Sequence, residues 1–325
     1  MPRVSNILVP IDIHENAVPI VLWAAVLARA TSSPLTLLHV NEALEFLKDR
    51  PGFRGGGLAS LEMTLDTWRQ HYQQDARTTL ATLAHQHCDG LSVFRLILEG
   101  RAHATILGTI ETARSDLVIM GTHGRPWYQR VFLGSTAEAV LRASAVPMLI
   151  VPNRGNSFPP PRMLRMLLST DFSPASVGGE EWVQYLTQHG VREVVLVHAI
   201  ENPLLDIYSP DTADLDLKHV SEESRQHPPR SAQPYWENAM QVAQSRLNQL
   251  RQQLLAPPSP VLRAEIVVTE GTPAMAIIAA AEQHQVDGIV MATHGRSGIR
   301  RFVLGSVTEK VLRSSSRPVL AVPSR

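Results

Sequence analysis

The chain has 325 residues, and chains of this length usually fold into more than one domain. Its content of 44% hydrophobic and 18% charged residues is typical of a globular rather than a disordered protein. Lysine plus arginine and aspartate plus glutamate each number 30, so no net charge attracts nucleic acid or a membrane surface, and we expect neither as a partner. A single cysteine excludes an intrachain disulfide, and no apolar run is long enough for a signal peptide core or a membrane span, so we expect a soluble cytoplasmic protein.

Short apolar runs alternate with longer helical patterns along the first part of the chain. The predicted strands are 6–11, 35–40, 93–98, 116–120 and 147–151. The predicted helices are 16–31, 59–87, 102–113 and 136–144. Continuous apolar runs separated by helices indicate a parallel sheet that is covered on both faces and has right-handed crossovers.

The same alternation follows a Pro-rich segment, 154–162, whose three consecutive prolines favour an extended linker. The predicted strands are 165–169, 194–199, 262–268, 288–292 and 318–322. The predicted helices are 175–188, 235–255, 273–285 and 307–315. We expect the polar, Pro-rich stretch 201–234 to be a mobile loop.

The two parts are copies of one another. His123 to Pro152 and His294 to Pro323 align without gaps with sixteen identities at an offset of 171. Asp12 and Asp171 need an offset of 159, so the second copy has 12 extra residues, which we assign to its long loop. The sequence therefore predicts two tandem domains, 1–153 and 163–325, each an open, doubly wound α/β unit with a five-stranded parallel sheet.

A glycine-rich loop follows the fourth strand of each copy, at the edge of the sheet where such folds bind ligands. In the first copy Gly121 and Gly124 are followed, after nine residues, by Gly134 and Ser135. Glycines allow backbone N–H groups to converge on an anion, and the start of the next helix adds further donors. This pattern predicts a phosphate site, with Arg125 and Arg130 as nearby countercharges.

A structural alternative explains part of this pattern. Ser135 with Glu138, and Ser306 with Glu309, have the spacing of a capping box, in which the two side chains satisfy the first helical N–H groups without any ligand. A capping box does not explain the two spaced glycines, and the repetition of the loop after matching strands favours the phosphate site.

Polar side chains recur where the first two strands of each copy end. Asp12 and Asp171 could accept hydrogen bonds from a ribose hydroxyl or an adenine amine. An Asx turn or a helix N-cap is the alternative, and it would be preferred if the glycine loop were absent. We interpret His39 and His198 as polar residues at a strand end rather than as metal ligands or general bases, and we expect no metal site made by protein side chains.

Three common nucleotide and hydrolase motifs are absent. The chain has no G-x-x-x-x-G-K-[ST], no G-x-G-x-x-G after the first strand and no G-x-S-x-G. The sequence therefore does not support three protein classes: a P-loop ATPase, a dinucleotide dehydrogenase and an α/β-hydrolase.

The G-2x-G-9x-G-[ST] spacing, the ILVP-x-D opening and the closing P-x-L-x-V-P strand resemble the universal stress protein family, and the two copies resemble its tandem-domain members. The resemblance covers the chain apart from the linker and the loops after the second strands. It implies a Rossmann-like, adenine nucleotide alpha hydrolase-like fold. It also implies a stress-response regulator that binds ATP or AMP, with magnesium as the nucleotide's counterion, and that has no dedicated catalytic apparatus. A scaffold without nucleotide, and a slow ATPase or adenylyl-transfer enzyme, stay open as alternatives.

The resemblance also implies which residues surround the nucleotide. In the first copy they are Pro10, Ile11, Asp12, Val40, Met120, Gly121, His123, Gly124, Arg125, Gly134, Ser135 and Thr136. In the second copy they are Ser169, Thr170, Asp171, Ala199, Met291, Ala292, His294, Gly295, Arg296, Gly305, Ser306, Val307 and Thr308. The chain departs from the family pattern at Ala292, which replaces the first glycine, and at Pro126-Trp127, which adds bulk to the first spacer.

The last strand of this family commonly pairs two domains into a dimer. The resemblance therefore implies that Met148–Val151 lies against Val319–Val322 within one chain, as an intramolecular pseudo-dimer. The remaining sheet edges could pair two tandem chains as a homodimer, and a regulator of this kind implies a protein partner that the sequence does not identify.

Overall fold

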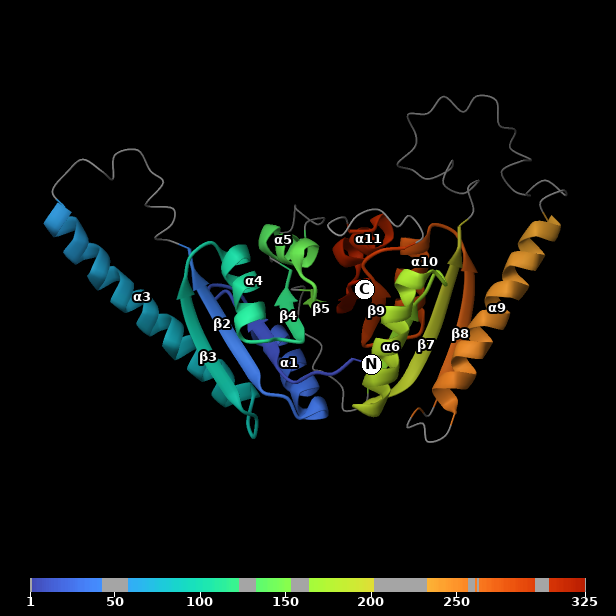
Figure 1. Ribbon diagram of the computed structural model, residues 1–325, viewed down its shortest axis with the longest axis horizontal. Helices are drawn as coiled ribbons and strands as arrows, with labels where there is room; N and C mark the ends of the chain where they lie inside the picture. The colour runs from blue at the N-terminus through green and yellow to red at the C-terminus, as the bar shows by residue number, and fades with distance from the viewer. Residues whose placement is uncertain are drawn as a thin grey trace, which may run out of the picture.

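The chain folds as two α/β halves side by side, with helices on both faces of a central sheet (Figure 1). The computed structural model describes residues 2–42, 58–122, 133–152, 164–201, 233–256, 261, 263–295 and 304–324. We call residues 2–152 the first half and 164–324 the second half. The linker 154–162 and nearly all of the predicted loop 201–234 lie outside the described residues.

Each half has five strands in the expected order. The first half contains β1 (Ile7–Pro10), α1 (Val18–Thr31), β2 (Leu35–Asn41), α3 (Leu58–His87), β3 (Val93–Glu99), α4 (Ala102–Thr112), β4 (Leu117–Gly121), α5 (Ser135–Ala143) and β5 (Met148–Val151). The second half contains β6 (Leu164–Ser169), a 3-10 turn (Pro174–Ser176), α6 (Val177–Gln188), β7 (Val191–Ile200), α9 (Gln233–Leu255), β8 (Arg263–Glu270), α10 (Pro273–Gln283), β9 (Gly288–Ala292), α11 (Ser306–Ser314) and β10 (Val319–Val322).

The ten strands form one continuous sheet in the order β3-β2-β1-β4-β5-β10-β9-β6-β7-β8. Pairing is parallel within each half and antiparallel only where the halves meet, with Leu149 of β5 opposite Leu320 of β10. The predicted pairing of the last two strands is therefore confirmed, and it merges the two predicted sheets into one.

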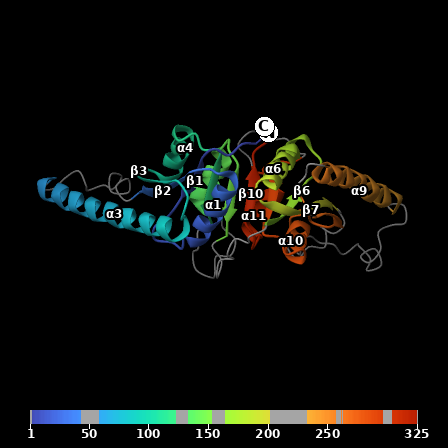
Figure 2. The same cartoon turned by 90° about the horizontal axis from the view of Figure 1, so that it is seen from below.

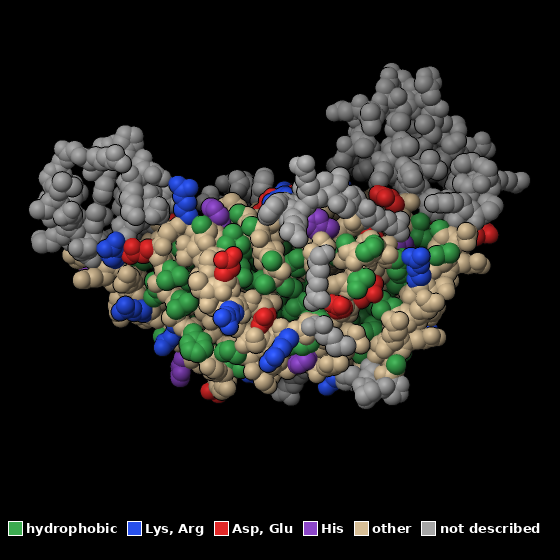
Figure 3. All heavy atoms as spheres, viewed as in Figure 1, with side chains coloured by type: hydrophobic (Ala, Val, Ile, Leu, Met, Phe, Trp, Pro, Cys, Tyr) green, Lys and Arg blue, Asp and Glu red, His purple; other side chains and the backbone are tan. Residues whose placement is uncertain are grey.

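The two faces of this sheet carry different helices. The first buried cluster packs α1, α3, α6 and α9 on one face, and the second packs α4, α5, α10 and α11 on the other. Figure 2 shows that α3 and α9 extend toward opposite ends of the molecule, as a two-fold relation between the halves requires. On the face drawn in Figure 3, charges of both signs are interspersed with hydrophobic side chains.

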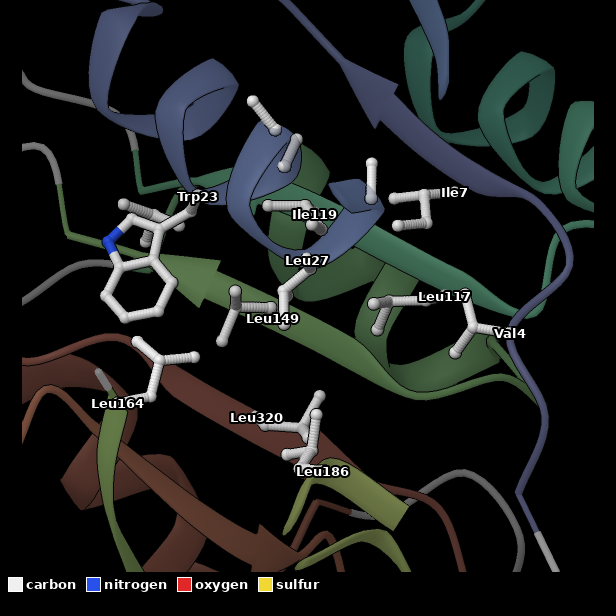
Figure 4. Close-up of a cluster of buried hydrophobic side chains, with 14 of the residues drawn as sticks. Val4, Ile7, Trp23, Leu27, Leu117, Ile119, Leu149, Leu164, Leu186 and Leu320 are labelled. Atoms are coloured by element: carbon white, nitrogen blue, oxygen red, sulfur yellow. The ribbon is translucent and has the colours of Figure 1, made fainter. Parts of the chain in front are cut away.

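The first cluster crosses the junction between the halves. Figure 4 shows Trp23, Leu27 and Leu149 from the first half facing Leu164 and Leu320 from the second. All five side chains are buried, with at most 7% of their surface exposed, so the halves share a single apolar core on this face. A tandem chain with such a core has no separate hydrophobic interior for each copy there.

The predicted element boundaries are close to the observed ones. The largest difference is β7, which begins at Val191, three residues before its predicted start. The helix predicted to begin at residue 175 instead opens with a 3-10 turn, as is common at helix ends. Within the described part of the chain, no helix has the length and apolar character that crossing a membrane requires.

Candidate functional site

A cavity of about 760 Å³ lies in the second half, between α9 and the ends of β6, β7 and β9. It is lined by twelve of the residues that the sequence indicates for this copy: Ser169, Thr170, Asp171, Ala199, Met291, Ala292, His294, Gly295, Gly305, Ser306, Val307 and Thr308. Arg296 lies outside the described residues. Residues from the start, middle and end of the second copy thus meet around one space, because the carboxyl ends of parallel strands share an edge.

Asp171 joins the end of β6 to the glycine loop. Its Oδ1 atom accepts a hydrogen bond from the backbone N–H of Ser173 at 3.0 Å, which is the Asx turn considered above. Its Oδ2 atom faces Gly295, where a Cβ would lie only 2.9 Å away. A Cβ at residue 295 would therefore displace the Asp171 carboxylate from this position.

Asp12 makes the same local turn in the first half. Its Oδ1 atom accepts from the backbone N–H of His14 at 2.9 Å. The N-cap interpretation is wrong for Asp12, because the residue preceding α1 is Ala17. For Asp171 it fails too, since Ser173 precedes the 3-10 turn and Ser176 precedes α6.

The start of α11 borders the cavity with its backbone N–H groups. Gly305 is the N-cap, and no side chain in the described structure caps the helix. The Thr308 hydroxyl instead donates to the carbonyl of Ala292 at 2.8 Å, which ties the helix to the end of β9. Uncapped N–H groups at a helix start are donors for an anion, reinforced by the helix dipole.

The capping-box alternative is wrong in both halves. Ser135 and Ser306 are the first helical residues, one position too late to cap, because Gly134 and Gly305 hold the N-cap positions. The glutamates face arginines instead: Glu138 lies 2.8 Å from Arg142, and Glu309 lies 2.6 Å from Arg313. Each pair joins residues four apart on one helix.

Ala292 fits its position without backbone strain. It does not adopt a positive φ, and neither does the equivalent Gly121, so the loop does not require glycine for conformational reasons at this point. This departure from the family pattern leaves the geometry of the second site intact.

Equivalent histidines tie the first two strands of each half together. Nδ1 of His198 lies 2.8 Å from the carbonyl oxygen of Thr170, and Nδ1 of His39 lies 2.9 Å from that of Ile11. A carbonyl only accepts, so each Nδ1 carries the proton. Burial lowers the pKa of His39, which favours this neutral form. Within the described residues no cluster of three metal-ligating side chains occurs.

His294 carries an unsatisfied polar atom at the cavity. Its Nδ1 atom lies 2.9 Å from the Thr293 hydroxyl. Its Nε2 atom is buried and has no hydrogen-bond partner among the residues that the structure describes.

One wall of the cavity was missed by sequence reasoning. Five residues of α9 line it: Asn238, Ala239, Val242, Ala243 and Arg246. They share one helix face at spacings of three and four residues, but nothing in the sequence shows which strands that face meets. The wall also includes Phe172, which has φ of 58°, lies 4.5 Å from the His198 ring and carries the Arg246 guanidinium at 5.3 Å.

In the first half, the described residues of the predicted set lie at the matching sheet edge. Pro10 ends β1, and Ile11 and Asp12 follow it. Val40 is the next-to-last residue of β2, and Met120 and Gly121 end β4. Gly134 is the N-cap of α5, and Ser135 and Thr136 are its first two residues. His123, Gly124, Arg125, Arg130, Pro126 and Trp127 lie outside the described residues.

Tyr72 of α3 occupies the space beside this edge. Its hydroxyl lies 2.9 Å from Nε2 of His39 and 3.4 Å from Nε2 of His14. The Tyr72 ring centre is 5.6 Å from that of His39 and 5.9 Å from that of His14. The first half thus places an aromatic cluster between α3 and β2, where the second half has part of its cavity.

The family model described as universal stress protein family matches residues 4–152 and again residues 163–323. The chain belongs to the universal stress protein family. A universal stress protein of Mycolicibacterium smegmatis is 28% identical over 321 residues, covering 98% of this chain and 97% of that relative. A shorter family member from Methanocaldococcus jannaschii is 27% identical over 161 residues, which are 49% of this chain and 93% of its own length.

Solved structures of the family share the fold. A universal stress protein from Archaeoglobus fulgidus superposes with a TM-score of 0.59 at 17% identity, covering 99% of this chain and 97% of its own. A putative family member from Pseudomonas aeruginosa gives a TM-score of 0.57 at 16% identity, covering 99% and 94%. At these identities the likeness supports the two-domain α/β architecture and nothing finer.

Proposed function

We propose that this universal stress protein is a regulatory protein that binds an adenine nucleotide, ATP or AMP, in the cavity of its second half. One observation carries the proposal: twelve residues that the family pattern indicates line a single cavity of about 760 Å³. That volume lies within the range of roughly 300–1,000 Å³ that is usual for small-molecule sites.

The cavity offers separate surroundings for the parts of a nucleotide. The uncapped start of α11, with Gly305 and Ser306, provides N–H donors for phosphate, and magnesium would accompany the phosphates as their counterion. The Asp171 carboxylate can accept hydrogen bonds from the sugar hydroxyls. The rings of Phe172 and His198 provide flat surfaces for the base.

The proposed role is binding rather than catalysis. Nucleotide binding would favour one state of the protein, which a partner protein then reads. The balanced charge and the lone buried cysteine, Cys88, support a cytoplasmic setting.

Calorimetric titration with ATP and with AMP, each with and without magnesium chloride, tests the proposal. Val242 is 46% exposed on the α9 wall, so Val242→Glu adds a negative charge to the cavity without disturbing the core. Gln244→Glu adds the same charge to an exposed position of α9 that does not line the cavity. We expect Val242→Glu to weaken binding at least tenfold and Gln244→Glu to leave it unchanged; no binding to the unmodified protein at millimolar nucleotide would refute the proposal.

A further inference from the structure

The two halves differ at one helix position that faces the site. Ala76 and Leu80 of α3 are fully buried, and Ala243 and Leu247 of α9 are buried with the same spacing. Residues four apart lie on one helix face, so Tyr72, one turn before Ala76, corresponds to Ala239, one turn before Ala243. This match has an offset of 167, which corrects the assignment of all 12 extra residues to the long loop: eight precede α9, and four lie between α9 and β8. The same place therefore carries a phenol in the first half and a methyl group in the second.

The phenol is held in place by an oriented hydrogen bond. His39 donates through Nδ1 to the Ile11 carbonyl, so its Nε2 atom can only accept, and the Tyr72 hydroxyl donates to it at 2.9 Å. Burial raises the pKa of Tyr72 and lowers that of His39, so both groups are neutral near pH 7 as this bond requires. The His14 ring contacts Tyr72 from another side.

The second half keeps the histidine and lacks the phenol. His198 makes the same Nδ1 bond to the end of β6, and its ring borders the cavity together with Ala239 and Ala243. The helix position that lines the cavity in the second half thus carries a small side chain, and the matching position in the first half carries a ring that contacts His39.

We propose that Tyr72 is a built-in plug that fills the first half's counterpart of the nucleotide cavity, so that each chain binds one nucleotide, in its second half. This inference rests on the proposed function. A ligand entering the first half would have to expel the ring and leave the buried His39 acceptor unpaired, which opposes binding there. The pseudo-dimer is thereby made asymmetric, with one binding half and one closed half.

Reciprocal substitutions test the plug, with ATP and magnesium chloride as the calorimetric probe and the number of sites as the readout. We expect one site in the unmodified chain, two in Tyr72→Ala, none in Ala239→Tyr, and one in the double variant. Tyr72→Phe keeps the ring and should keep a single site. Thermal unfolding of each variant checks that it is folded.

The outcomes separate this inference from the proposed function. Two sites in the unmodified chain, or one site in a folded Tyr72→Ala, would overturn the plug while leaving nucleotide binding intact. No site in the unmodified chain but one in Tyr72→Ala would support the plug and overturn the second-half site. Should Tyr72→Ala not fold, undiminished binding by Ala239→Tyr would overturn the plug.

Discussion

Gly121 at the end of β4 packs directly against Ile20 of α1, so closely that a Cβ at 121 would lie 2.6 Å from Ile20 Cδ1. The second half reverses the sizes: Ala292 occupies the strand position, and Gly179 of α6 lies across from it, where its own Cβ would be 3.9 Å from the Ala292 nitrogen. Each half therefore places one small residue in this helix-strand contact.

We expect Gly121→Ala to lower the free energy of unfolding by about 1–3 kcal/mol, because Ile20 has to move in a packed core. Combining it with Ile20→Ala should cost less than the sum of the two single changes. Gly108→Ala is the control: it lies inside α4, a Cβ there meets nothing within 4 Å, and it should stabilise by about 1 kcal/mol. Urea unfolding is measured for the unmodified protein and the four variants, and strictly additive effects of the changes at 121 and 20 would contradict the contact.

A substitution that leaves a cavity in the core shared by the halves should lower the free energy of unfolding. Leu149 is 2% exposed and lies opposite Leu320, so Leu149→Ala should cost about 2–5 kcal/mol. Leu98→Ala removes the same atoms from a side chain that is 36% exposed and should cost much less. Because the core spans both halves, we expect one unfolding transition by circular dichroism; two well-separated transitions would show that the halves unfold independently.

The helices α5 and α11 are linked across the junction by ion pairs. Arg142 lies 3.5 Å from Glu309, and Arg313 lies 3.7 Å from Glu138. These side chains are about a quarter to a third exposed, so a double-mutant cycle on Arg142 and Glu309 should give a coupling of less than about 1 kcal/mol that shrinks as salt is added. A larger, salt-insensitive coupling would mean that the pair is far less hydrated than its exposure indicates.

His39 should make stability depend on pH on the acid side. Burial lowers its pKa in the folded protein, so the unfolded chain binds a proton more readily, and stability rises with pH. The contribution is complete above the unfolded pKa of about 6.5 and is lost as the pH falls through the folded value. The difference in unfolding free energy between the unmodified protein and His39→Gln should therefore shrink from pH 7.5 to pH 5.5. A difference that grows on acidification would contradict this sign.

Arg246 should contribute to nucleotide affinity through its contact with Phe172. Arg246→Ala removes a cation 5.3 Å above that ring at the cavity wall, and we expect ATP binding to weaken roughly twofold to thirtyfold. Arg251→Ala, on the same helix but away from the cavity lining, serves as the control. Equal effects of the two changes in calorimetry would indicate a general loss of positive charge instead.

The sequence predicted the strands and most helix boundaries, because apolar runs and the glycines between them reflect local geometry. The pairing of β5 with β10 was implied only by the family resemblance, and the structure confirms it. The sequence also indicated the strand-end and loop residues that meet at the second cavity. It misplaced the helix caps, because Ser135 and Ser306 have the spacing of a capping box but begin one residue too late to act as one. It did not predict that α9 forms a wall of the cavity or that Tyr72 contacts His39, because a helix pattern shows which residues share a face and not which strand that face covers.

The sequence by itself determined that the chain is a tandem repeat of one α/β unit with a glycine loop in each copy. Only the tertiary structure decided that the copies share one sheet and one core, and that their sites differ. The physical reason is that a repeat can be recognised from the order of residues alone. The side chain that a helix places at a site depends on how the helix packs, and it is Tyr72 in one half and Ala239 in the other.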